Sequence, residues 1–210
     1  NNSVSNLGMS AFDATNGITD SYNSGNQSFG GAPLVIGLGY NFSVAPKWLF
    51  GIGVDYSALS QKSSSYGESA SSANGFVSLN GATIQMSNRV NFFVAPGYEI
   101  SKDQLIYLKA GYSMITQKIN SPNSYICSGV DCVGPSGSLA SGSQSKTLSG
   151  YILGLGYKQI ITGGLYGFAE FNYMSYGKPT YSGQLDTDYN ATVSPSTNSY
   201  QGLIGVGYKF

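Results

Sequence analysis

Histidine is absent from the 210 residues of this sequence. A serine nucleophile needs a neighbouring base, most often histidine, and without one its hydroxyl is inert at neutral pH. A serine–lysine pair or paired carboxylates would still allow catalysis in principle, but the acidic residues are scattered along the chain. We therefore expect a protein that is not an enzyme and that carries no cofactor.

Charged residues are scarce as well. Ten Lys+Arg and ten Asp+Glu make up 10% of the chain and cancel to a net charge of zero, whereas typical soluble domains are about a quarter charged. No basic stripe is present, which argues against nucleic acid as a partner. Hydrophobic residues reach only 41%. A barrel in lipid would reconcile these values, because its outer wall is apolar while its lumen and loops are polar.

Long apolar runs and cysteines are also few. No stretch approaches the roughly 18 consecutive apolar residues of a membrane-spanning helix. No positively charged segment followed by an apolar one opens the chain, as expected of a mature, processed form. The two cysteines, Cys127 and Cys132, lie in the sequence CSGVDC. Their spacing suits a small disulfide ring in an oxidising compartment, and a metal site would need four ligands.

A short Gly-Tyr phrase recurs four times. It reads GLGYNF at 37–42, APGYEI at 95–100, GLGYKQ at 154–159 and GVGYKF at 205–210. The last copy ends on Phe210, with apolar residues at every second position before it. A terminal aromatic residue on an alternating strand is typical of bacterial outer-membrane β-barrels. The repeat predicts a module of two strands with their connections.

Strict alternation of apolar with small or polar residues predicts seven strands, at 34–42, 48–57, 84–94, 106–114, 150–158, 165–173 and 201–210. We expect the apolar face, which includes Ile84 and Met86, to point outward. All charges within these strands fall on the other face: Asp55, Arg89, Lys109, Lys158, Glu170 and Lys209. Lipid requires this sorting, since a Lys or Arg near the midplane costs about 2–4 kcal/mol. A soluble sandwich would bury its apolar faces and expose its charges.

An eighth strand is expected at 4–12, where the alternation is loose, because bacterial single-chain barrels have an even number of strands. Connections at 43–47, 99–103 and 160–164 are short, whereas those at 13–31, 60–75, 119–146 and 178–199 are long and polar. The predicted fold is therefore all-β, a single domain over 1–210. It is a transmembrane antiparallel up-and-down β-barrel of eight strands with short periplasmic turns and long extracellular loops.

This pattern resembles the small porin-like outer-membrane barrels of the OmpA/OmpX type from Gram-negative bacteria. The phrases GLGYKQIITGGLYGFAEFNY at 154–173 and LIGVGYKF at 203–210 carry the resemblance. It implies an outer-membrane location with loops at the cell surface, and outer-membrane lipid and the barrel-insertion machinery as partners. By the same resemblance, Phe210 would be the assembly signal. Outer-membrane enzymes with related barrels resemble one another in needing a histidine.

Several residues are candidates for specific roles. Asp55, Arg89, Lys109 and Glu170 would form a charge cluster in the lumen, either paired structurally or acting as a gate for ions. Aromatic residues beside the short turns would form a rim: Tyr40, Trp48, Tyr98, Tyr157 and Tyr208. Tyr107 and Tyr166 point inward by parity. Asp186, Asp188 and Asn190 have the opening spacing of a calcium loop, but the glycine and glutamate that should follow are absent, so no metal site is expected.

The leading functional hypothesis is a non-enzymatic outer-membrane barrel whose extracellular loops provide surface structure or contacts. One alternative is a small gated pore for ions or small solutes. Another is a subunit of a surface array or fibre, in which copies of the barrel self-associate. The lipid-facing assignment predicts that Leu108→Arg blocks insertion while Gly111→Ser is tolerated.

Overall fold

The computed structural model describes residues 1–13, 18–22, 24–72, 75–129, 136–139, 142–186 and 189–209. Within these ranges the chain forms seventeen strands: β1 (Asn2–Ser5), β2 (Met9–Asp13), β3 (Ile18–Tyr22), β4 (Gln27–Phe29), β5 (Val35–Ala45), β6 (Trp48–Ser57), β7 (Gln61–Lys62), β8 (Tyr66–Ser72), β9 (Gly75–Ser101), β10 (Gln104–Asn120), β11 (Ser124–Gly129), β12 (Ser136–Ser138), β13 (Ser143–Thr162), β14 (Leu165–Tyr176), β15 (Tyr181–Asp186), β16 (Tyr189–Val193) and β17 (Ser196–Tyr208). No helix in the described ranges has the length and apolarity to cross a membrane.

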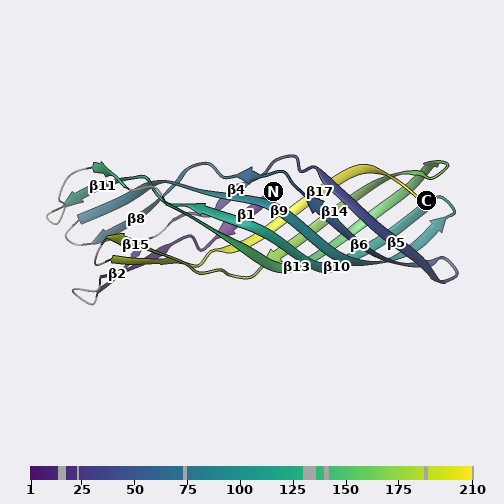
Figure 1. The fold of residues 1–210 in the computed structure, drawn as a ribbon, viewed down its shortest axis with the longest axis horizontal. Helices are drawn as coiled ribbons and strands as arrows, with labels where there is room; N and C mark the ends of the chain where they lie inside the picture. The colour runs from purple at the N-terminus through teal and green to yellow at the C-terminus, as the bar shows by residue number, and fades with distance from the viewer. Residues whose placement is uncertain are drawn as a thin grey trace.

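The main sheet follows the order of the chain from β5 to β17, and β1 and β4 come after β17. β5 pairs with β6 and β6 with β9, and the sheet continues through β10, β13, β14, β17, β1 and β4. Every pairing is antiparallel, and the tilted strands wrap around a common axis (Figure 1). The all-β, antiparallel expectation is confirmed. Among the described residues no pairing joins β5 to β17, so the sheet is not closed along that seam, and the strand segments outnumber the eight expected.

The four long polar connections expected from the sequence contain strands of their own. Much of those segments forms further strands at the end of the molecule opposite the C-terminus (Figure 1). We call β2, β3, β8, β11, β12, β15 and β16, with the adjoining end of β9, the distal extension. β9 is 27 residues long and its far end pairs with both β8 and β11. A strand that projects this far offers free backbone groups on both edges, and the polar segments beside it satisfy those groups by pairing.

The expected first strand at 4–12 is interrupted. Asn6 has a φ of 54°, which lies in the left-handed region that breaks a strand. β1, before it, pairs with β17 and β4, whereas β2, after it, pairs with β16 and β3 in a separate sheet. Val4 and Leu7, on either side of the break, are fully buried. The break lets the chain leave the main sheet and enter the distal extension.

A second irregularity reverses the faces of β9. Asn88 has a φ of 52°, and the pairing of β9 with β10 shifts between Met114 and Thr116. Such a β-bulge adds one residue to a strand and moves the following side chains to the other face. Val90, Phe92 and Val94 therefore lie outward as expected, but Ile84 and Met86 are buried inside. The prediction that those two side chains point outward is wrong.

Candidate functional site

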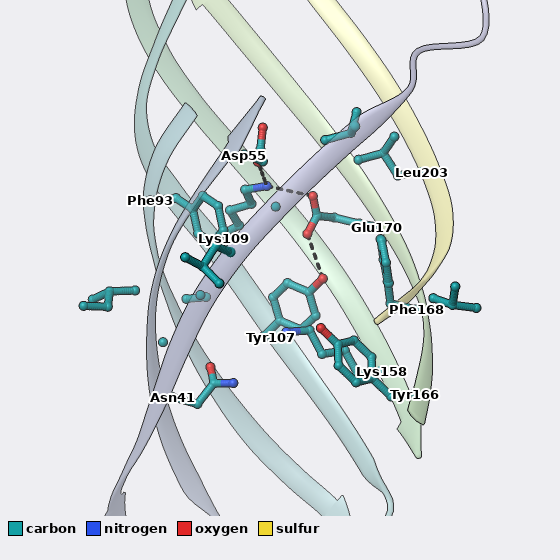
Figure 2. Close-up of a pocket in the computed structure, with 18 residues that line it drawn as sticks. Asn41, Asp55, Phe93, Tyr107, Lys109, Lys158, Tyr166, Phe168, Glu170 and Leu203 are labelled. Atoms are coloured by element: carbon teal, nitrogen blue, oxygen red, sulfur yellow. Dashed lines mark hydrogen bonds and ion pairs between the residues drawn. The ribbon is translucent and has the colours of Figure 1, made fainter. Parts of the chain in front are cut away.

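The sheet encloses a cluster of charged side chains around Lys109 of β10. The Lys109 ammonium Nζ lies 2.7 Å from Oδ2 of Asp55 on β6 and 2.9 Å from Oε1 of Glu170 on β14. The Lys109 side chain is only 3% exposed, and each carboxylate side chain is 8% exposed. Figure 2 shows the ammonium between the two carboxylates. One cation is thus shared by two buried anions.

Neighbouring polar groups complete this arrangement. The Tyr107 hydroxyl donates to Oε2 of Glu170 at 2.7 Å, and the Asn172 amide donates to its Oε1 at 2.6 Å. The Asn91 amide donates to Oδ1 of Asp55 at 2.5 Å. A buried charge is tolerated only when it is paired and hydrogen-bonded. Tyr107 and Asn91 bond the carboxylate oxygens that Lys109 does not contact, and Asn172 shares Oε1 of Glu170 with Lys109. Strand parity in the sequence predicts that Tyr107 points inward. The sequence does not indicate its hydrogen bond to Glu170.

Aromatic rings contact the lysines from the sides. Lys109 Nζ lies 4.0 Å from the centre of the Phe93 ring, and Lys158 Nζ lies 4.9 Å from the Tyr107 ring and 5.4 Å from the Tyr166 ring. These are cation–π distances. Beside the rings lies a cavity of about 190 Å³, lined by the cluster and by Gly37 of β5 and Leu203 of β17. The second lysine balances the charge of the second carboxylate.

Arg89, the fourth member of the expected cluster, lies apart from it. Its guanidinium donates to Asn2 Oδ1 at 3.0 Å and to Ser199 Oγ at 2.7 Å, and the Ser199 hydroxyl also contacts the Asn2 side chain. Arg89 therefore joins β9 to the strand pair β1 and β17. Charge alone suggested a carboxylate partner. The sequence does not indicate the neutral partners Asn2 and Ser199, because only folding brings β1 beside β17.

An apolar plug fills the interior beyond the cluster. It consists of the buried side chains Val4, Leu7, Phe29, Tyr66, Ala82, Ile84, Met86, Ile115, Leu148, Ile152, Met174 and Tyr176. Along β13 the plug begins at Ile152, two residues from Gly154, which pairs with Lys109. An eight-stranded barrel has an interior only wide enough for side chains, and here the plug shares it with buried polar side chains such as Gln117 and Thr197.

The distal extension has its own small core and its own cavity. Met9, Leu79 and Ala191 are buried together, with Val77 and Tyr125 packed against them. Glu68 on β8 is only 6% exposed, faces a cavity of about 110 Å³, and leaves Oε2 without a hydrogen-bond partner. Burial raises the pKa of this carboxyl to about 7. Composition and spacing had not singled out Glu68.

The aromatic side chains of the expected rim lie near the short turns. Trp48 and Tyr98 contact each other across β6 and β9, with ring centres 5.2 Å apart. Tyr40 and Tyr208 are exposed, and Tyr157 is half-buried and donates to the Gln159 side chain. This placement is compatible with a rim. The rim itself stays a prediction.

Some expected residues lie outside the part of the chain that the structure describes. Cys127 is disulfide-bonded, but Cys132 is outside the described residues, so the pairing of the two remains a prediction. Phe210 and Asp188 are also outside, and the side chains of Asp186 and Asn190 are not described. One substitution expectation is wrong: a Cβ at Gly111 would overlap the backbone carbonyl of Phe92 on β9, so Gly111→Ser is not compatible with the close strand pairing.

The chemistry of the interior is that of a buried ion-pair network. Each carboxylate is held by a lysine and by neutral donors, so neither is free to take a proton from a substrate. A general base needs an accessible lone pair within reach of the proton that it abstracts. The geometry supports pairing and plugging of the lumen rather than catalysis.

A family model and two solved structures align with this chain over most of its length. Structures of Ail, the attachment invasion locus protein of Yersinia pestis, align over 95% of both chains at 13% identity and a TM-score of 0.33. Ail in complex with the heparin analogue sucrose octasulfate aligns over the same shares at 11% identity and a TM-score of 0.36. No curated protein matches the sequence. Residues 3–210 match the family described as outer membrane protein beta-barrel domain, and the chain belongs to this family.

Proposed function

We propose that this protein is a closed eight-stranded barrel that catalyses no reaction and presents its distal extension for contacts at the cell surface. The protein lies in the bacterial outer membrane with its loops at the cell surface. The distal extension contains the connections that we assign to that surface. Phe210 as assembly signal, with barrel-insertion machinery as its reader, belongs to the same proposal.

One observation carries the contact role. At the tip of the extension, Phe76 on β9 is 40% exposed and Ile126 on β11 is 53% exposed. Phe76 lies opposite Ser128 and Ile126 opposite Ser78, so both side chains are on the same face of the paired strands. Apolar side chains exposed away from lipid are typical of interaction sites. The small core behind them holds the tip in a defined shape.

The contact role is tested with Phe76→Ser combined with Ile126→Ser. Cells that display wild-type protein should associate and settle, and the double variant should lose most of that association. The matched control is Ser78→Ala with Ser128→Ala, which changes the same two strand pairs without removing apolar surface. Equal settling of the double variant and wild type, at equal surface amounts, would contradict a contact role for the tip.

A gated pore is the second candidate, and the cavity beside the charge cluster is the observation that favours it. The apolar plug argues against it. Wild-type protein in a planar bilayer should therefore be silent, while Ile152→Gly, which shortens the plug, should produce conductance steps. Leu153→Gly on the outward face is the matched control. Steady steps in wild type that Glu170→Ala abolishes would favour the pore instead.

A surface array or fibre is the third candidate. It uses the same tip surface, with a second copy of the chain as the partner. Electron microscopy of cell envelopes distinguishes an array from contacts between cells. The envelopes come from cells that express wild type or the Phe76→Ser, Ile126→Ser variant. Regular arrays that disappear in the variant would favour the array. Association between cells without arrays supports the surface-contact role.

A further inference from the structure

The cavity of the distal extension lies between the two sheets of the fold. Its volume is about 110 Å³. One part of its wall comes from β8, β9, β10 and β13 of the main sheet, and the other from β2, β15 and β16 of the four-stranded sheet. Figure 1 places β8, β15 and β2 together at the end of the molecule opposite the C-terminus. The cavity shares no lining residue with the one beside the charge cluster of the barrel.

The lining combines buried apolar or aromatic side chains with exposed polar residues. The buried ones are Met9, Tyr66, Ala82, Tyr181 and Ala191. The exposed ones are Ser121, Gln144, Ser182 and Thr192. The cavity therefore reaches the surface of the extension, where a molecule dissolved in water has access to it. Few, well-placed polar groups in a mainly apolar wall are typical of sites for small molecules.

Glu68 carries the only charge among the described residues that line this cavity. Its side chain belongs to a residue that is 6% exposed, and it lies opposite Leu79 of the small apolar core. Within the part of the chain that the structure describes, Oε2 of Glu68 has no hydrogen-bond partner. Burial raises the pKa of this carboxyl to about 7. A buried carboxylate oxygen of this kind is stabilised by a donor that enters the cavity, most strongly by a cationic one.

The size of the cavity limits what can reach Glu68. An apolar cavity of about 150 Å³ holds benzene with its six carbons, so this volume in proportion holds about four or five non-hydrogen atoms. The rings of Tyr66 and Tyr181 line it, and aromatic faces attract cations as well as alkyl chains. The Tyr181 hydroxyl donates to Oε1 of Gln117 at 2.9 Å, which fixes the position of that ring. These features fit a short alkyl chain that ends in an ammonium group.

We propose that the cavity between the two sheets binds a primary alkylammonium group of about four carbons. Its ammonium donates to Oε2 of Glu68, and its carbon chain packs between Tyr66 and Tyr181. This site is separate from the exposed tip at Phe76 and Ile126 and does not depend on a contact role there. The same aminobutyl chemistry occurs in free amines and in the side chain of lysine, and the last experiment below distinguishes these two sources.

The first test compares two ligands of equal length. Saturation-transfer NMR measures the binding of n-butylammonium and of neutral 1-butanol, at pH 8.5, to the full chain refolded in phosphatidylcholine nanodiscs. Glu68→Gln should weaken butylammonium binding by about tenfold, the loss of one charge-assisted hydrogen bond, and should leave butanol binding unchanged. Glu99→Gln is the matched control and should bind both ligands as wild type does. Equal butylammonium affinity of Glu68→Gln and wild type, or no saturable binding to wild type, would overturn the proposal.

A pH series on wild type tests the same contact without any substitution. The ammonium pairs with the carboxylate form of Glu68, so butylammonium affinity should rise by about tenfold between pH 6 and pH 8.5 as that group ionises. The other titratable groups in the described lining are Tyr66 and Tyr181. Burial raises the pKa of both, that of Tyr181 to about 12, so they stay neutral in this range. A flat profile for butylammonium in wild type would contradict the pairing.

The last experiment identifies the source of the ammonium group. Nα-acetyl-lysine methylamide presents the lysine side chain as it occurs in a protein, whereas n-butylammonium represents a free amine. Tighter binding of the lysine derivative supports the site as a receptor for a lysine of a partner protein. Tighter binding of butylammonium supports it as a site for free amines. Binding of neither ligand would overturn the proposal.

Discussion

The barrel and the distal extension arrange the same residue types in opposite ways. In the barrel, Leu108 and Phe171 are exposed on the outer face while Lys109 and Asp55 are buried inside. In the extension, Leu79 and Met9 are buried and serine-rich faces are exposed. The medium outside each region explains the difference, because apolar side chains are stable in lipid or in a core and charged ones are not.

A single strand shows where the change occurs. β9 runs through both regions, and the bulge at Asn88 separates outward Val90 and Phe92 from buried Ile84 and Met86. Even-numbered residues thus change faces without any change in the sequence pattern. One additional residue in the ladder suffices to convert a lipid-facing strand into a core-facing one.

The largest expected effect comes from breaking the interior ion pairs of the barrel. Lys109→Met leaves Asp55 and Glu170 without their shared cation, and removing one partner of a buried pair costs about 3–5 kcal/mol. The triple variant Lys109→Met, Asp55→Asn, Glu170→Gln should be less destabilised because no charge is left alone. Urea unfolding of refolded protein in lipid vesicles measures both. A single variant as stable as wild type would show that the network contributes nothing.

The next effect contrasts the outer faces of the two regions. Leu108→Arg places a cation on the exposed face of β10. It should lower the free energy of unfolding in lipid by about 2–4 kcal/mol. Ile126→Arg, on the exposed tip of the extension, should fold normally because water surrounds it. The heat-modifiable shift on gels reports folding in vesicles. Equal folding of Leu108→Arg and wild type would remove the lipid-facing assignment.

The third effect is a pH dependence confined to the extension. The pKa of Glu68 rises from 4.5 to about 7 because burial disfavours its carboxylate. The folded state therefore binds the proton more tightly than the unfolded state, and stability falls as the pH rises from about 4.5 to about 7, by at most about 3 kcal/mol.

Glu68→Gln should remove that slope and stabilise the extension above pH 7. Unfolding at pH 5 and pH 8, monitored by hydrogen exchange in β8, measures both the slope and the stability above pH 7. Glu99→Gln, at a half-buried position beside a short turn, is the matched control and should leave the slope unchanged. Persistence of the slope in Glu68→Gln would assign the pH dependence to another group.

The smallest effect concerns the bulge that separates the two regions. Asn88→Val should destabilise by about 1–2 kcal/mol, because a β-branched residue adopts a positive φ only with strain. Asn88→Gly allows the positive φ without strain but loses the hydrogen bond from the Tyr56 hydroxyl at 3.1 Å. Its free energy of unfolding should therefore be closer to that of wild type. Urea midpoints in lipid rank the three proteins. A valine variant as stable as the glycine variant would show that the bulge is not strained.

Parts of the candidate site could be predicted because they depend on strand parity alone. Alternation places Lys109, Asp55 and Glu170 on one face of three strands, and closing those strands around an axis brings them together. Arg89 has the same parity but lies farther along the axis than the cluster, beside Asn2 and Ser199. Parity assigns a face, but the distance along the axis depends on register, which pairing sets.

The sequence by itself determined the class of this protein. Apolar alternation, scarce and one-sided charge, and the Gly-Tyr strand endings suffice for a lipid-embedded antiparallel barrel, because each is a local response to lipid outside and a polar lumen inside. Only the tertiary structure decided the distal extension, the breaks at Asn6 and Asn88, the buried Glu68 and the seam between β5 and β17. These features depend on which backbone edges meet, and edge pairing joins residues far apart in the chain whose side chains carry no mark of their partner.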